Sequence, residues 1–189
     1  LIFVLHLILP LQVSAEKQVV LIEILAERQA HIAVDAIFSL AASSENTVNV
    51  AATKALAKVS VQEDLPRLVT LMLKAESSRQ QTEAGRAIVT LCLQNEDVQK
   101  RAAPLLSAYG SASTVQKIAI LKLLPAIGGK GAFQVVLAGT KSLDAKTRDA
   151  AIRGLAQWKD AEALAAQCEM ASDTTELNYH VMNLKGYID

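Results

Sequence analysis

The residue types that most often carry out chemistry are few in this chain and stand far apart. Histidine occurs at His6, His31 and His180, and cysteine occurs at Cys92 and Cys168. Zinc sites, dithiol sites and nucleophile sites need such residues at short fixed spacings, as in HExxH, CxxC or GxSxG, and none of these motifs occurs. The sequence therefore predicts no metal ion, no cofactor and no catalytic residue. Both cysteines stand in apolar segments, which predicts small buried hydrophobic side chains.

One glycine-rich stretch, IGGKGAF at residues 127–133, has some features of a phosphate-binding loop. It lacks the GxxxxGK[ST] spacing that lets successive N–H groups surround a phosphate. Glycine also ends helices, because it adopts the left-handed conformation without strain. The stretch is therefore predicted to be a turn between two helices.

Three further side chains could belong to a ligand site. Trp158 and Tyr187 could form a flat platform, but both fall on or near buried positions of the repeat described below, which favours packing. His180, in NYHVMN, is predicted to lie on a helix surface or to be lightly buried.

The composition favours helices and argues against a protein that grips nucleic acid. Apolar residues make up 51% of the 189 residues but aromatic residues only 4%, so the core must consist of Ala, Leu, Val and Ile. Eight glycines and four prolines suit helices joined by short turns. Basic and acidic residues number 19 each, whereas proteins that bind phosphate backbones normally carry a basic excess.

A repeated pattern indicates how the helices are arranged. TVNVAATKALAKVS and KTRDAAIRGLAQWKD both contain a pair of alanines whose first member stands five positions ahead of a leucine. Equivalent positions recur every 31 to 34 residues, at Leu25, Leu56, Val89, Leu123, Leu155 and Tyr187. A period in the thirties is typical of stacked two-helix units, each too small to bury its apolar face alone. We therefore predict an all-α fold, a right-handed α–α superhelix (α-solenoid) of about five or six helix pairs.

The predicted repeats form a single domain over residues 1–189. They occupy residues 14–42, 44–75, 77–109, 111–142 and 143–172, followed by a partial repeat at 173–189. In each, a polar turn with capping residues precedes a first helix, and a second helix closes the unit. VQKRAAPLLSAY, residues 98–109, is predicted to be such a second helix. FQVVLAG could pass for a strand, but its place in the period predicts a helix.

The apolar start of the chain has two interpretations. LIFVLHLIL aligns without a gap on LPRLVTLML, which favours the second helix of a truncated repeat at residues 1–9. The alternative is the remnant of a signal peptide over residues 1–15, ending in small residues. The apolar run is too short to cross a bilayer, so no transmembrane span is predicted.

The repeats resemble a known family. Near the C-terminus the pattern RxAAIRxLxxW is matched by Arg148, Ala150, Ala151, Ile152, Arg153, Leu155 and Trp158. The pattern LRGYI is matched by Leu184, Lys185, Gly186, Tyr187 and Ile188, with lysine in place of the usual arginine. Nearly the whole chain resembles HEAT repeats, an armadillo-type α-solenoid family, and about the last 45 residues resemble HEAT-like repeats of large exported bacterial proteins.

This resemblance implies a non-catalytic interaction scaffold, or an ancillary module of a larger protein in the bacterial periplasm or cell envelope. The expected partner is another protein or a neighbouring domain of the same chain. In such solenoids the second helices line the concave docking face. The cations predicted there are Arg67, Lys74, Lys100 and Arg101, which would favour an acidic partner segment. The alternative is an enzyme with its site in the concave groove, similar to pigment-lyase or base-excision HEAT proteins.

Overall fold

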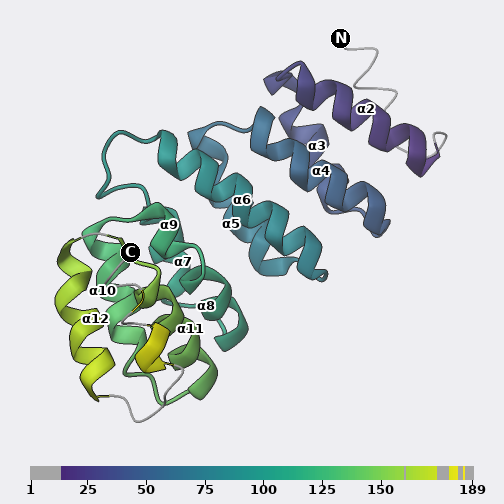
Figure 1. Ribbon diagram of the computed structural model, residues 1–189. Helices are drawn as coiled ribbons and strands as arrows, with labels where there is room; N and C mark the ends of the chain where they lie inside the picture. Colours follow the sequence, from purple (N-terminus) through teal and green to yellow (C-terminus); the bar gives the residue numbers. More distant parts are fainter. Residues whose placement is uncertain (1–13, 160, 174–178, 183–184, 186–189) are drawn as a thin grey trace. The chain divides into compact units, whose positions relative to one another are not determined.

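A computed structural model describes residues 14–159, 161–173, 179–182 and 185 (Figure 1). These residues form helices and turns, with no strand among them. Contacts divide the chain into two compact units, Leu1–Gln94 and Asn95–Asp189, where the sequence predicts one domain. The boundary falls inside the predicted third repeat at 77–109.

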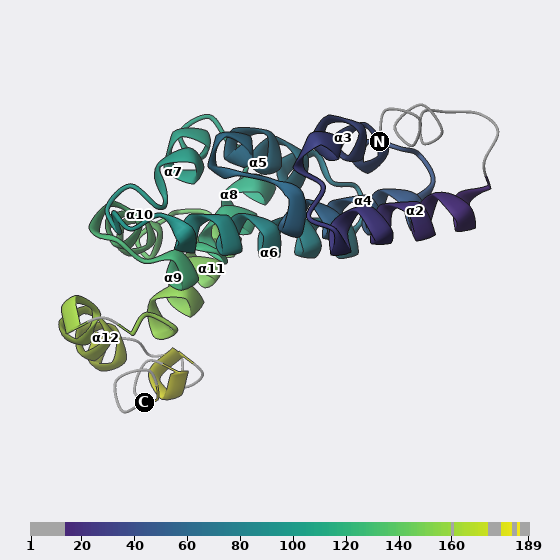
Figure 2. The same cartoon turned by 90° about the horizontal axis from the view of Figure 1, so that it is seen from above.

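The first unit is a two-layered array of helices. It contains α2 (Ala15–Glu27), α3 (Val34–Ala41), α4 (Asn46–Val59), α5 (Leu65–Lys74) and α6 (Ser78–Gln94). Short 3₁₀ turns, η1 (His31–Ala33) and η2 (Gln62–Asp64), lead into α3 and α5. The helices α2, α4 and α6 lie side by side, and α3 and α5 form a second layer (Figure 2). Helix α4 packs on α2, α3 and α6, and α6 also packs on α5, which is consistent with an α-solenoid.

The core of this unit repeats a small residue followed by a large one. Ala52 and Leu56 on α4 are fully buried, as are Ala84 and Ile88 on α6. Residues four apart share one helix face, so each alanine lets the neighbouring helix approach while the larger side chain fills the space beyond. The predicted position Val89 is only half-buried, and Ile88 takes its place. The predicted register was therefore wrong by one residue in α6.

The second unit is built around one central helix. It contains α7 (Ala103–Tyr109), α8 (Thr114–Leu121), α9 (Leu124–Ile127), α10 (Lys130–Gly139), α11 (Ala145–Ala156) and α12 (Ala161–Asp173). Helix α11 packs on α8, α9, α10 and α12. The stretch FQVVLAG lies in α10, so the prediction of a helix is confirmed.

The first helix predicted for the fourth repeat is broken in two. Pro125 has no N–H to donate to the carbonyl of Leu121, and its ring crowds that carbonyl, so α8 ends at Leu121 and α9 starts afresh at Leu124. Leu121 and Leu124 are fully buried, whereas Leu123 is half-buried. The prediction that Leu123 fills the same core position as Leu56 was wrong for this reason.

The helix predicted at residues 98–109 begins only at Ala103. Asp97 Oδ1 accepts the N–H of Gln99 at 3.0 Å, and Arg101 Nε donates to the Asn95 carbonyl at 2.7 Å. These bonds hold a turn, and Pro104 lacks the N–H that a helix through residue 100 would need. The prediction was therefore wrong for the first five residues.

The structure confirms the predicted turn at IGGKGAF and the predicted caps of α8 and α11. Gly128 and Gly129 have φ angles of 77° and 94°, which confirms a left-handed turn in IGGKGAF. A Cβ on Gly129 would lie 2.7 Å from the Val98 carbonyl oxygen, so only glycine fits there. Ser113 and Asp144 accept N–H groups of the first turns of α8 and α11, as their cap positions predict.

Some predictions fall on residues outside the described ranges. These are the segment 1–9, His6, Tyr187 and most of the partial repeat at 173–189. Among the helices that the structure does describe, none is both long and apolar enough to span a membrane.

Candidate functional site

The predicted cation Arg67 on α5 is engaged within the first unit. Its Nη1 lies 2.8 Å from Asp35 Oδ1 on α3 and 3.3 Å from Asp64 Oδ1. The guanidinium carbon also lies 3.9 Å from the centroid of the Phe38 ring. Two carboxylates and one aromatic face therefore hold this side chain, and its charge is compensated inside the array.

The other three predicted cations do not gather around Arg67 as a set. Lys74, at the end of α5, lines the same hollow as Arg67, a groove of about 480 Å³, and has no ion pair within the described ranges. Lys100 pairs with Asp97 at 3.0 Å, and Arg101 donates to a backbone carbonyl. Lys100 and Arg101 belong to the turn before α7, not to a second helix.

The spacing of charged residues in the sequence indicates which cations form ion pairs inside the array. Asp35 and Arg67 are 32 residues apart, and Glu27 and Lys58, whose side chains meet at 2.6 Å, are 31 residues apart. Both separations equal one repeat, so the paired residues occupy equivalent places on successive helices. Opposite charges one period apart therefore identify cations that are not available to a partner.

The histidines have structural partners. His31 Nδ1 lies 2.7 Å from the carbonyl oxygen of Val59 and ties η1 to the end of α4. His180 is half-buried, as predicted, with Nδ1 2.6 Å from the carbonyl oxygen of Ala171. In the ranges that the structure describes, no three His, Cys, Asp or Glu side chains come close enough together to hold a metal ion.

Burial was predicted for Trp158 and for both cysteines, and the structure confirms it for Trp158 and Cys92 only. Trp158 is buried against Phe133, with ring centroids 5.4 Å apart, which confirms a packing role. Cys92 is buried as predicted, but Cys168 is exposed. The inward face of α12 carries residues four apart, Ala163, Gln167 and Ala171, and Cys168 lies one position off that face.

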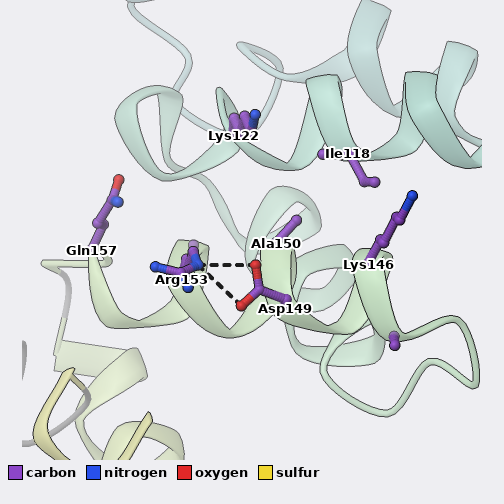
Figure 3. A pocket seen from close by; sticks show the side chains of 9 residues that line it. Ile118, Lys122, Lys146, Asp149, Ala150, Arg153 and Gln157 are labelled. Carbon is purple, nitrogen blue, oxygen red and sulfur yellow. Dashed lines mark hydrogen bonds and ion pairs between the residues drawn. The ribbon is translucent and has the colours of Figure 1, made fainter. Parts of the chain in front are cut away.

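A groove lies between α8 and α11 in the second unit (Figure 3). Its volume is about 610 Å³. The apolar lining consists of Ile118 from α8 and of Ala145, Ala150 and Gly154 from α11. The polar lining consists of Lys122, Lys146, Asp149, Arg153 and Gln157. We call this hollow the α8–α11 groove.

Small residues on α11 set the depth of the α8–α11 groove. A Cβ on Gly154 would lie 3.4 Å from Pro125 Cγ and 3.5 Å from the Leu121 carbonyl oxygen, so α11 sits close against the break between α8 and α9. The short side chains of Ala145 and Ala150 leave space above them. Gly154, which lines the groove, therefore packs directly against Pro125, the residue at which the first helix of the fourth repeat is broken.

One ion pair lies along α11 on the groove lining (Figure 3). Arg153 Nε donates to both carboxylate oxygens of Asp149, at 3.0 and 2.9 Å, and the Tyr179 hydroxyl donates to Asp149 Oδ1 at 2.8 Å. The hydrogen bond from Arg153, helped by that from Tyr179, lowers the pKa of Asp149 below its ordinary value. The same bond raises the pKa of Arg153. Both groups therefore stay charged at neutral pH.

Two lysines in the α8–α11 groove resemble Lys74 of the first unit rather than Arg67. Neither Lys122 nor Lys146 makes an ion pair or side-chain hydrogen bond within the described part of the chain. Lys146 is the second residue of α11, where the helix dipole disfavours a positive charge, although the carboxylate of the cap Asp144 attracts it. The sequence segment LDAKT contains this signal, a lysine two residues after a capping aspartate, although the segment by itself predicts only the start of a helix.

Comparisons with known proteins bear on the fold alone. No protein family model matches the sequence, and no curated protein matches it. The structure is similar to the crystal structure of an engineered protein from the Northeast Structural Genomics Consortium, with a TM-score of 0.51 and 19% sequence identity. The match covers 98% of this chain and 95% of that one, and supports an all-helical fold.

Proposed function

We propose that the chain is a non-catalytic protein-interaction module of the HEAT-repeat type. In this proposal the α8–α11 groove docks a segment of a partner protein or of a neighbouring domain. The observation that carries the proposal is an open groove of about 610 Å³ with an apolar floor and two lysines that make no local ion pair. Grooves with an apolar floor and a few polar groups are common ligand and peptide sites.

The charges in the groove favour docking over catalysis. A general acid or base works best with a pKa near neutrality. The pKa of Asp149 is shifted down and that of Arg153 is shifted up, so each moves away from neutrality. Their hydrogen bonds to each other also occupy the atoms that a proton transfer would use.

A display library of random peptides, selected on the whole chain, tests the proposal. Ala145 is exposed and lines the groove, so Ala145→Trp fills it without disturbing the core. Leu143 is fully exposed two residues earlier and does not line the groove, so Leu143→Trp is the matched control. We expect the enriched peptides to bind wild type and Leu143→Trp but not Ala145→Trp. The proposal fails if no peptide is enriched, or if the enriched peptides bind Ala145→Trp as well as wild type.

A further inference from the structure

The residues that line the α8–α11 groove carry an excess of positive charge. Asp149 and Arg153 neutralise each other, and Lys122 and Lys146 make no ion pair within the described residues. Lys146 is attracted to Asp144, but that carboxylate does not line the groove. Figure 3 shows these lysines on opposite walls, one following α8 and one at the start of α11. A segment lying in the groove would therefore meet a cation from each side.

The position of Lys146 adds an independent argument. A lysine in the first turn of a helix opposes the helix dipole, whereas an acidic residue there would be favourable. Local rules of stability are broken most often where a residue serves function. In the first unit Lys58 and Arg67 are matched by carboxylates one repeat away, whereas Lys74 is not.

From these observations we infer that the occupant of the α8–α11 groove is an acidic peptide segment, with carboxylates placed among small aliphatic side chains. The inference rests on the proposed function and deepens it. Carboxylates pair with Lys122 and Lys146, and the aliphatic side chains cover Ile118 and Ala150 on the floor. Complementary charge of this kind gives specificity and faster association.

The groove fits an acidic peptide better than a nucleic acid. The side chains that line it include no aromatic ring on which a base could stack. The carboxylate of Asp149 would repel a phosphate backbone. The chain as a whole also has no net charge, so no long-range field attracts a polyanion.

Three synthetic peptides of equal length and equal apolar content test the inference by fluorescence anisotropy. One repeats Glu-Ala-Val-Asp, the second replaces the acids with their amides, and the third replaces them with lysine. We expect the acidic peptide to bind, the amide peptide to bind on the order of tenfold more weakly, and the basic peptide not to bind. Added salt is expected to weaken the binding of the acidic peptide.

Charge reversals on the protein complete the test. Lys146→Glu is expected to lower the affinity for the acidic peptide on the order of tenfold, and Lys122→Glu by a similar factor. Lys141 is also exposed in the second unit but lies outside the groove, so Lys141→Glu should bind like wild type. Circular dichroism of each variant establishes that the helices are intact.

Three results would overturn the inference: equal binding of the amide peptide, no effect of Lys146→Glu, or tighter binding of a single-stranded RNA with the same lysine dependence. Failure of the inference is distinguishable from failure of the proposed function. Library peptides that are blocked by Ala145→Trp but carry no acidic residues would leave a docking groove with a different occupant. The absence of any groove-dependent peptide would remove both.

Discussion

A single methyl group at Gly139 tests how closely α10 and α11 pack. A Cβ at this position would lie 2.8 Å from the Cβ of Ala151 and 3.7 Å from Leu121 Cδ2. The Cβ of alanine is fixed to the backbone and cannot rotate away, so the two helices would have to separate. Overpacking of this kind lowers the free energy of unfolding by about 1–3 kcal/mol, and the better helix propensity of alanine offsets at most about 1 kcal/mol. We therefore expect Gly139→Ala to be less stable than wild type by about 1–2 kcal/mol.

Gly110 provides the matched control, because it also stands at the end of a helix and an added Cβ would meet nothing within 4 Å. Gly110→Ala should be neutral or slightly more stable. Urea unfolding followed by circular dichroism gives the free energy for each variant. Ala151→Gly alone should also lower the stability, because glycine is a poorer helix former, but in the double variant it removes the clash. The double variant should therefore be more stable than the sum of the two single effects predicts. Equal stability of Gly139→Ala and Gly110→Ala, or additive effects in the double variant, would refute close packing of α10 on α11.

Further predictions concern the core, the ion pair and the groove. Leu56→Ala removes a fully buried side chain and should lower the free energy of unfolding by about 2–5 kcal/mol, whereas Leu143→Ala, at a fully exposed residue, should change it by less than about 0.5 kcal/mol. Equal urea midpoints for these two variants would contradict the assigned core. Tyr179→Phe should raise the pKa of Asp149 in a carboxyl NMR titration, because it removes a hydrogen bond to the ionised form. Since the folded pKa of Asp149 is below its ordinary value, its contribution to stability is present above that ordinary value and lost as pH falls through the folded pKa. The variant should lose this contribution at a higher pH, and an unchanged titration would argue against the bond. Lys146→Glu gains a favourable interaction with the helix dipole but loses the attraction to Asp144, so the free energy of unfolding should change by less than about 1 kcal/mol at low salt, and a larger decrease would show that the lysine supports the fold.

The sequence predicted the helix array because one spacing rule operates along the whole chain. Leu56 and Leu155 are fully buried, and Trp158 packs in the core, as the period requires. The spacing rule gave wrong helix bounds where a proline prevents a helix from continuing. Pro104 and Pro125 each remove a helical N–H, so one helix starts late and another is broken. Both prolines are visible in the sequence, and a stricter use of them would have found both breaks.

The candidate site was harder to predict, because a list of basic residues does not show which of them already have partners. Arg67 is held by Asp35, one repeat earlier, and the period itself could have revealed this. The groove could not be foreseen in the same way. It depends on how closely Gly154 brings α11 to the broken helix, which is a property of packed helices and has no sequence motif.

The ion pairs between residues one repeat apart bear on how the protein folds during its synthesis. When Lys58 emerges from the ribosome, Glu27 has been made only 31 residues earlier, and Asp35 precedes Arg67 by 32. Each new helix therefore finds its partners already present, and only a short loop has to close. We expect the nascent chain of the first unit to fold one hairpin at a time as it emerges. The apolar surface exposed to chaperones at any moment would then be that of the newest hairpin alone.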